Sequence, residues 1–197
     1  MSEYRFTLTF ALDTSDADAD ELVERLGEAV CDDAAVGIGR RGRLALEFAR
    51  DAEGAAEAVT SALADVRRAV PDATLIEASP DLVGLTDVAG LLGVSRQNMR
   101  KLILRSDAPA PVPVHEGRPT IWRLAKVLRW LRDEKKYPVS PGLVELAFTT
   151  MQVNLAVDMR DADSDAQREL NELLGEGPRG HAGISGADGG PRRLHDG

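Results

Sequence analysis

The most informative stretch of this chain is Leu85-Thr-Asp-Val-Ala-Gly-Leu-Leu-Gly-Val-Ser-Arg-Gln-Asn-Met-Arg-Lys-Leu-Ile103. Its apolar residues recur where two helices that cross steeply over a tight turn must bury side chains into each other. Ala89 is small enough for the closest approach of the helices, and Gly93 stands where the turn needs a left-handed backbone. Ser95 is a favourable N-cap for the second helix. The stretch therefore predicts a helix-turn-helix whose inward side chains are Val88, Leu92, Val94, Met99 and Leu102.

Polar residues dominate the outer face of the second predicted helix, residues 95–104. In a helix-turn-helix this helix presents its N-terminal residues to the DNA major groove, where arginine pairs bidentately with guanine and glutamine with adenine. The predicted base-reading residues are Arg96, Gln97 and Arg100. The predicted phosphate-contacting residues, placed at the helix N-terminus or on its flanks, are Ser95, Asn98, Lys101 and Arg105. The alternative is that these side chains only solvate an outer helix face.

Residues 108–122 follow as an extended, proline-rich segment that turns at Glu116-Gly117 and returns to Trp122. A short hairpin with His115 and Arg118 at its tip has the shape of a wing, which can contact the DNA backbone or minor groove. A helix over residues 123–136 comes next, with an apolar inner face and basic residues outside. Trp122 and Trp130 belong to apolar stripes, so we expect them to anchor the core and not to stack on bases.

The charge distribution singles out this same central region. The whole chain has a net charge of −9, but residues 81–140 carry 11 basic against 6 acidic residues, a net +5. Residues 1–80 carry −9 and residues 141–197 carry −5. Local positive charge is what neutralises phosphates and releases counterions. The centre of the chain is therefore the only region that we expect to bind nucleic acid.

The first 79 residues alternate between strand and helix periods. Apolar residues at every second position from Tyr4 to Phe10 predict a half-buried strand. Later elements are predicted as a helix to about residue 31, a hairpin over 36–48, a helix over 55–70 and a strand over 73–78. This β-α-β-β-α-β order is that of the ferredoxin-like sandwich, so residues 1–79 are predicted to be an α+β domain of that type. Such a scaffold hosts many functions and identifies none.

The remainder of the chain is predicted to be helical and then disordered. We expect the winged module over residues 80–137, a helical segment over 138–174 and a disordered, glycine-rich tail over 175–197. Leu143, Ala147, Met151 and Leu155 lie four apart on a helix over residues 142–159. That helix could pack on the DNA-binding module or pair with a second copy, and periodicity alone does not choose. A further amphipathic stretch contains Leu170, Leu173 and Leu174.

A pattern of Leu-x-x-Val-Ala-x-x-Leu-Gly-Val-Ser, then a proline-rich wing with Gly-Arg, then a Trp-led helix ending in Trp-Leu, runs through residues 85–131. In this respect, about a quarter of the chain resembles the winged helix-turn-helix modules of the MerR-like and AlpA-like (excisionase-type) group. The resemblance implies sequence-specific binding of double-stranded DNA by a transcription regulator or a recombination directionality factor. The chain lacks the long coiled-coil helix that dimerises many MerR-like regulators. The matching positions are Leu85, Val88, Ala89, Leu92, Gly93, Val94, Ser95, Gly117, Arg118, Trp122, Trp130 and Leu131.

Enzymatic chemistry has no positive signal in the sequence. Cys31 is the only cysteine, which favours a reducing compartment and a cytoplasmic protein. No apolar run approaches the roughly 20 residues needed to cross a bilayer. There is no phosphate-cradling glycine loop, HExxH motif or nucleophile elbow. The three histidines, His115, His181 and His195, are too scattered for a metal site. We therefore expect no enzyme activity, cofactor or metal.

Three functional hypotheses follow from these patterns. The leading one is a transcription regulator whose central module binds double-stranded DNA while the acidic residues 1–79 sense a small molecule, bind a protein partner or dimerise. The second is a protein-interaction adaptor in which the helix-turn-helix is only a scaffold. The third, an enzyme on the ferredoxin-like sheet, needs a ligand pocket that the sequence does not disclose.

Overall fold

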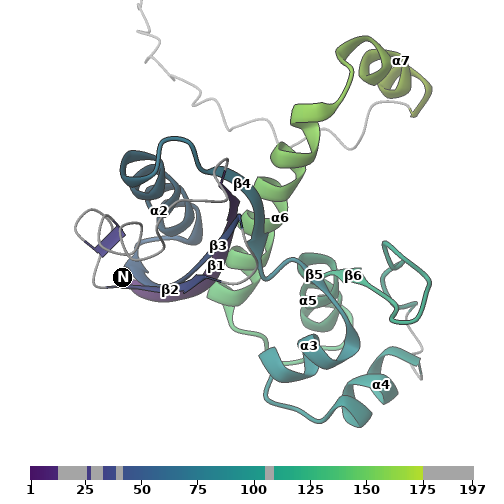
Figure 1. Ribbon diagram of the computed structural model, residues 1–197. Coiled ribbons are helices and arrows are strands. Elements are labelled where there is room, and N and C mark those ends of the chain that lie inside the picture. The colour runs from purple at the N-terminus through teal and green to yellow at the C-terminus, as the bar shows by residue number, and fades with distance from the viewer. Residues whose placement is uncertain (13–25, 28–32, 39–41, 105–108, 175–197) are drawn as a thin grey trace, which may run out of the picture. The chain divides into compact units, whose positions relative to one another are not determined.

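The computed structural model describes residues 1–12, 26–27, 33–38, 42–104 and 109–174 of the 197-residue chain. These residues form a mixed α+β structure with a four-stranded antiparallel sheet, a two-stranded sheet and six α-helices (Figure 1). The chain divides into two compact units, Met1–Arg160 and Asp161–Gly197. Most of the helix predicted to end near residue 31, Arg105 among the predicted phosphate contacts, and the tail predicted to be disordered lie outside the described residues.

The four-stranded sheet has the order β2-β3-β1-β4, and each neighbouring pair is antiparallel. Its register places Phe6 opposite Phe48 and Leu8 opposite Leu46. Alternate residues of the two central strands are buried, as the period-two pattern of the sequence predicts. The sheet therefore has one apolar face and one face toward solvent. Its strands are β1 (Ser2–Ala11), β2 (Ala34–Ile38), β3 (Arg43–Ala52) and β4 (Thr74–Ser79).

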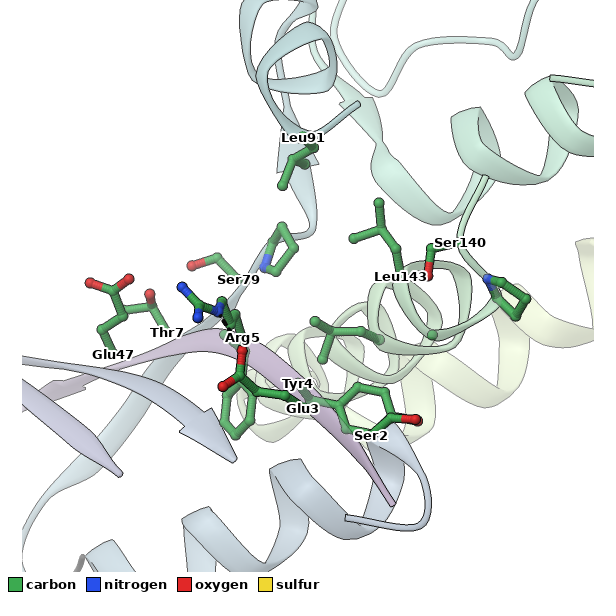
Figure 2. Close-up of a pocket in the computed structure, with 15 residues that line it drawn as sticks. Ser2, Glu3, Tyr4, Arg5, Thr7, Glu47, Ser79, Leu91, Ser140 and Leu143 are labelled. Carbon is green, nitrogen blue, oxygen red and sulfur yellow. Dashed lines mark hydrogen bonds and ion pairs between the residues drawn. The ribbon is translucent and has the colours of Figure 1, made fainter. Parts of the chain in front are cut away.

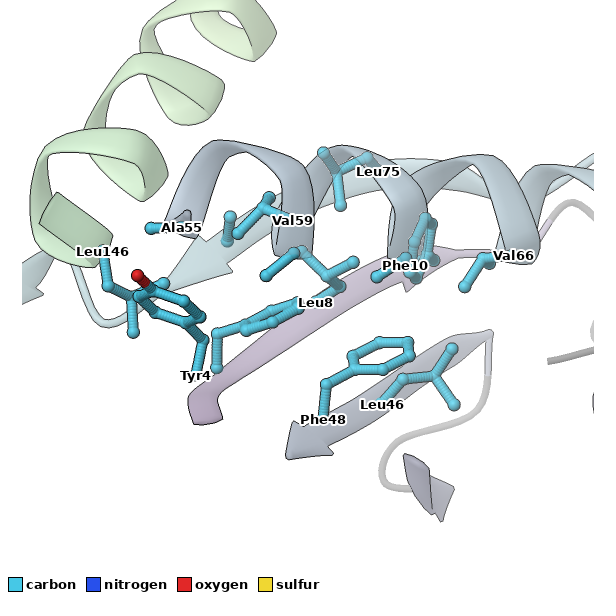
Figure 3. Packing of buried hydrophobic residues seen from close by; sticks show 14 of the residues in the cluster. Tyr4, Leu8, Phe10, Leu46, Phe48, Ala55, Val59, Val66, Leu75 and Leu146 are labelled. Carbon is cyan, nitrogen blue, oxygen red and sulfur yellow. The ribbon is translucent and has the colours of Figure 1, made fainter. Parts of the chain in front are cut away.

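Helix α2 (Ala55–Ala69) packs its apolar stripe on this sheet, as Figure 3 shows. Val59 and Val66 of α2 are fully buried, and the rings of Phe6 and Phe48 stack with their centroids 5.2 Å apart. Full burial of each side chain of this size contributes roughly 1.5–3 kcal/mol. Helix α2 ends just before Pro71, where the sequence predicts a stop.

A second hydrophobic core lies between helices α3 (Leu85–Leu91), α4 (Arg96–Leu104) and α5 (Leu124–Asp133). Two short antiparallel strands, β5 (Leu82–Val83) and β6 (Trp122–Arg123), lie beside these helices. The inward residues predicted for the region are all part of this core: Val88, Ala89 and Met99 are buried, and Leu92, Val94 and Leu102 are partly buried against them.

Helix α6 (Pro141–Asp158) packs on both cores at once. Leu146 belongs to the core of the sheet and its neighbour Ala147 to the core of the helical module. The helix contacts α2, β1 and β4 on one side and α5 on another. The sequence left open whether this helix packs on the helical module or pairs with a second copy. It packs on that module and also covers the sheet. Met1–Arg160 is consequently one compact unit.

Buried polar side chains fasten α6 to the segment that joins the two cores. The side-chain amide of Asn154 donates to the carbonyl of Ala78 at 2.8 Å and accepts from its N–H at 2.7 Å. It also donates to the carboxylate of Asp81 at 2.8 Å. Thr150 donates its hydroxyl to the carbonyl of Pro80 at 2.7 Å. We call the four residues Ala78, Asp81, Thr150 and Asn154 the junction clasp.

Asp81 is fully buried, and its charge is balanced by Arg123, with which it forms a hydrogen-bonded ion pair. The backbone carbonyl of Asp81 also accepts the N–H of Leu124, the first residue of α5, at 2.7 Å. A buried carboxylate is costly unless it is paired. Arg123 and Asn154 both donate to Oδ2 of Asp81, whereas its buried Oδ1 has no hydrogen-bond partner among the described residues. Asp81 therefore ties the sheet-to-helix connection to the start of α5.

The N-terminal half of α6 is held by Glu145. Its carboxylate accepts a hydrogen bond from the Tyr4 hydroxyl at 3.0 Å and from the N–H of Ala55 at 3.1 Å. The second bond caps the start of α2, where an acceptor stabilises the unpaired N–H groups. Burial, followed by the hydrogen bond to the Glu145 carboxylate, raises the pKa of Tyr4. Tyr4 therefore stays neutral and continues to donate.

The second unit contains helix α7 (Ser164–Leu174), after the short 3-10 turn Met159–Asp161. The carboxylate of Asp163 caps α7 by accepting the N–H groups of Asp165 and Ala166, and these bonds lower its pKa. This is the amphipathic stretch that the sequence indicates, but none of its residues is buried. None of the helices in the described part of the chain is long and apolar enough to span a membrane.

Candidate nucleic-acid interface

The turn between α3 and α4 has the hydrogen bonds of a Schellman motif. The N–H of Val94 bonds to the carbonyl of Ala89 at 2.9 Å, and the N–H of Gly93 bonds to the carbonyl of Gly90 at 3.1 Å. Gly93 has φ +65°, the left-handed conformation that the sequence predicts at this position. The chain can therefore leave α3 and start α4 within a few residues.

Ser95 caps α4 as predicted, since its hydroxyl accepts the N–H of Asn98 at 3.2 Å. This bond satisfies one of the N–H groups that have no partner inside the helix. The start of α3 is supported in a similar way, because the carboxylate of Asp87 accepts the N–H of Gly84 at 2.7 Å. Both helices of the motif thus begin at fixed residues.

Helix α4 has one buried side and one fully exposed side. Met99 is completely buried and anchors the helix on α3. The exposed side chains are those that the sequence proposes for DNA contact: Ser95, Arg96, Gln97, Asn98, Arg100 and Lys101. Within residues 96–103 the helix carries three basic residues and no acidic one. The positive end of the helix dipole adds to this charge, so the exposed side attracts anions.

The predicted wing is a tight loop closed by backbone hydrogen bonds. The N–H of Val114 donates to the carbonyl of Ile121 at 2.8 Å, and the N–H of Ile121 donates to the carbonyl of His115 at 3.0 Å. The loop between these residues carries His115 and Arg118, both exposed. The chain then continues from Ile121 directly into β6, which pairs with β5. The loop is therefore attached to the folded module at its base.

Gly117 lies in this loop where a side chain would meet its neighbour. A Cβ atom there would come within 2.1 Å of Nε2 of His115. The imidazole ring therefore lies against the backbone of Gly117. Any larger residue at this position would require the exposed ring of His115 to turn away.

The two tryptophans anchor the wing and α5 to the core, as predicted. The indole N–H of Trp122 donates to the carbonyl of Pro111 at 3.2 Å, which holds the proline-rich segment against the strand. Trp130 is buried in the second core, and the ammonium of Lys135 lies 5.5 Å from its ring centroid. Trp130 is buried and Trp122 is partly buried against the same core.

The structure brings the predicted site residues together in two groups. The exposed side of α4 holds the residues from Ser95 to Lys101 other than the buried Met99, and His115 with Arg118 lie in the loop between Val114 and Ile121. Arg105 lies outside the described residues. Sequence reasoning missed the ion pair of Asp81 with Arg123 and the junction clasp, which hold the segments on either side of the motif. No local pattern marks these residues, because the partners lie far apart along the chain, as Asp81 and Asn154 do at a separation of 73 residues.

A pocket of about 720 Å³ lies between the outer face of β1 and the helical module (Figure 2). Arg5, Thr7 and Glu47 line it from the sheet, and Leu91 and Leu143 line it from the helices. Arg5 pairs with Glu3 at 2.7 Å, and that contact raises the pKa of Arg5. The pocket is open and has a mixed polar and apolar lining, and both Arg5 and Glu3 are largely exposed.

Over the residues that the structure describes, no cluster of three or more histidine, cysteine, aspartate or glutamate side chains could hold a metal ion. No protein-family model, curated protein or solved structure matches this chain.

Proposed function

We propose that this chain is a transcription regulator that binds double-stranded DNA in a sequence-specific way through residues 80–137, as a winged helix-turn-helix of the MerR-like and AlpA-like type. The observation that carries the proposal is the way helix α4 is held. Met99 is buried and Ser95 caps the helix, while the polar side chains at positions 96–98, 100 and 101 are all exposed. A helix held this way can enter the major groove without moving its anchors.

In this proposal the exposed residues have separate tasks. Arg96, Gln97 and Arg100 read base edges, because their side chains have the donor and acceptor geometry for guanine and adenine. Ser95, Asn98 and Lys101 contact phosphates beside the groove, as does Arg105. His115 and Arg118 on the wing contact the backbone or minor groove.

Residues 1–79 are proposed to be a ferredoxin-like domain with a sensory, partner-binding or dimerising role. The strand order β2-β3-β1-β4 with antiparallel neighbours supports this scaffold, because two interleaved β-α-β units produce that order. The acidic character of the segment argues against DNA as its ligand. Its direct packing on α6 means that a ligand or partner bound there acts on the same compact unit that carries α4.

The test is fluorescence anisotropy of full-length protein with duplex fragments of the DNA upstream of its own gene, and with scrambled duplexes, across a salt series. We expect a preference for a specific duplex that persists at physiological salt, together with a steep loss of affinity as salt rises. Equal and weak binding to every duplex tried, including a genomic fragment library, would contradict the proposal.

Single substitutions sharpen this test. Arg96→Ala and Arg100→Ala are each expected to weaken specific binding by about 1–3 kcal/mol, and Lys101→Ala to weaken binding to all duplexes alike. Arg67→Ala on α2 is the matched control, since it removes an exposed arginine remote in sequence from the motif. Unchanged specific affinity in both arginine variants of α4 would rule out this docking mode.

The sequence also leaves two alternative functions open, a protein-interaction adaptor and a recombination directionality factor. A protein-interaction adaptor would return a stable protein partner and no enriched DNA on affinity purification of the full chain. A recombination directionality factor would bind DNA with the same residues, but its sites would lie at recombination junctions and not at promoters. Sequencing the DNA that is crosslinked to the protein in cells distinguishes these outcomes.

A further inference from the structure

Polar side chains from three neighbouring strands form one row on the face of the sheet that is opposite to its hydrophobic core. Glu47 of β3 and Ser79 of β4 both lie directly opposite Thr7 of β1. Side chains in such positions share a face, with their Cβ atoms about 4.5–5.5 Å apart. Arg5 lies two residues before Thr7 and therefore on the same face. All four side chains line the pocket beside β1, as Figure 2 shows.

The two charged groups beside Thr7 retain unused hydrogen-bonding capacity. Arg5 donates to the carboxylate of Glu3 through Nε at 2.7 Å, which leaves its two terminal nitrogens. Within the described ranges of the chain, neither those nitrogens nor the carboxylate of Glu47 have a hydrogen-bond partner. The planar pair of terminal nitrogens fits a carboxylate bidentately, and a carboxylate accepts readily from an ammonium group. The row therefore offers one site for a negative group and one for a positive group.

The charges of the pocket favour a ligand that carries both signs. Its charged lining consists of the two carboxylates of Glu3 and Glu47 and the guanidinium of Arg5, a net charge of −1. The hydrogen bond to Glu3 and, to a smaller extent, the charge of Glu47 raise the pKa of Arg5, so its guanidinium stays positive. An anion alone would meet two carboxylates, and a cation alone would leave the terminal nitrogens of Arg5 unused. A zwitterion pairs with both groups and leaves the net charge of the site unchanged.

The other wall of the pocket is apolar and comes from the helical module. Leu91 at the end of α3 and Leu143 near the start of α6 line it, together with Pro80 and Pro141. Leu91 is 42% exposed although it is large and apolar. Figure 2 shows Leu91 and Leu143 across from the polar row. An aliphatic group placed against them would be removed from water. The pocket volume of about 720 Å³ lies within the range of small-molecule sites, about 300–1,000 Å³.

We propose that the pocket beside β1 binds a free aliphatic α-amino acid. The ligand carboxylate bonds to the terminal nitrogens of Arg5, and the ligand ammonium bonds to the carboxylate of Glu47. The hydroxyls of Thr7 and Ser79 supply further hydrogen bonds, and the aliphatic side chain packs against Leu91. This proposal gives residues 1–79 a small-molecule ligand, and it holds whether or not the chain binds DNA.

The first experiment titrates ¹⁵N-labelled full-length protein with L-leucine and follows the backbone amide resonances by NMR. We expect saturable shifts at Thr7, Glu47 and Ser79 on the sheet and at Leu91 on α3. Shifts confined to other parts of the chain, or no saturable shift, would overturn the proposal. The readout involves no DNA, so its failure is distinct from a failure of the proposed DNA binding.

Three analogues test which parts of the ligand the pocket uses. L-leucinamide lacks the carboxylate, N-acetyl-L-leucine lacks the ammonium, and glycine lacks the aliphatic side chain. Each is expected to bind at least about tenfold more weakly than L-leucine, because each loses a charge-assisted hydrogen bond or several buried carbon atoms. Binding of L-leucinamide or N-acetyl-L-leucine as tight as that of L-leucine would overturn the zwitterion assignment in favour of a cation or an anion site. Equal binding of glycine would show that the apolar wall is not part of the site.

Substitutions with matched controls test the two charged groups. Arg5→Gln and Glu47→Gln are each expected to weaken L-leucine binding by about tenfold or more. Arg43→Gln and Glu77→Gln make the same chemical changes on the same face of the sheet but outside the pocket, and they are expected to bind as wild type does. All four side chains are exposed, so we expect the amide spectra to show folded protein in every variant. Unchanged affinity in Arg5→Gln and Glu47→Gln, or an equal loss in the controls, would contradict the proposed site.

Discussion

Gly93 and Gly90 lie three residues apart but have opposite backbone requirements. Gly93 has φ +65° in the turn after α3, whereas Gly90 lies within α3 itself. A Cβ atom added at either position would meet no other atom within 4 Å. Steric clash is thus absent at both, and only the backbone conformation distinguishes them.

Replacing these two glycines by alanine should therefore change stability in opposite directions. Gly93→Ala is expected to lower the free energy of unfolding by about 1–2 kcal/mol, since alanine is strained at a positive φ. Gly90→Ala is expected to raise it by about 0.5–1 kcal/mol, since alanine favours a helix interior. Urea denaturation followed by circular dichroism measures both. The same sign in the two variants would mean that Gly93 does not need its left-handed conformation.

Single residues of the motif could be predicted from the sequence because each has a local physical requirement. The left-handed conformation of Gly93 and the cap by Ser95 depend only on nearby backbone atoms. Asp81 and Asn154 could not be predicted in this way. These two residues bond to each other but are 73 residues apart along the chain, so only the folded structure shows that they meet.

At the scale of elements, Asn154 supplies a buried polar connection between α6 and the segment that joins the sheet to the helical module. This buried amide makes three hydrogen bonds, two to Ala78 and one to the Asp81 carboxylate. Removing the Asn154 side chain leaves the N–H and the carbonyl of Ala78, and the buried carboxylate of Asp81, without this hydrogen-bond partner. Each such loss costs about 1–3 kcal/mol.

Asn154→Ala is accordingly expected to lower the free energy of unfolding by about 2–4 kcal/mol, allowing for partial rearrangement. Gln152→Ala, at an exposed position of the same helix, serves as control and is expected to change it by less than about 0.5 kcal/mol. Chemical denaturation of the full chain provides both values. If Asn154→Ala were as stable as Gln152→Ala, the junction clasp would contribute nothing to holding the two cores together.

Element patterns predicted the strands, α2 and α5 well, because each of these elements buries one face against one core. They predicted α6 less well. A spacing of four residues drifts around a helix of 3.6 residues per turn, so Leu143 and Ala147 pack on the helical core while Leu155, two steps further, is 40% exposed. A helix that contacts two cores is apolar on more than one side, and its sequence period no longer reveals which side is buried.

At the scale of the whole molecule, the compact unit Met1–Arg160 carries two surfaces, the exposed face of α4 and the pocket beside β1. Helix α6 contacts both the sheet and α5, so neither surface is attached through a loose linker. A change of packing at the sheet can therefore be transmitted through α6 to α5 and to the module that carries α4. The proposed regulation of DNA binding by residues 1–79 would use this continuous contact.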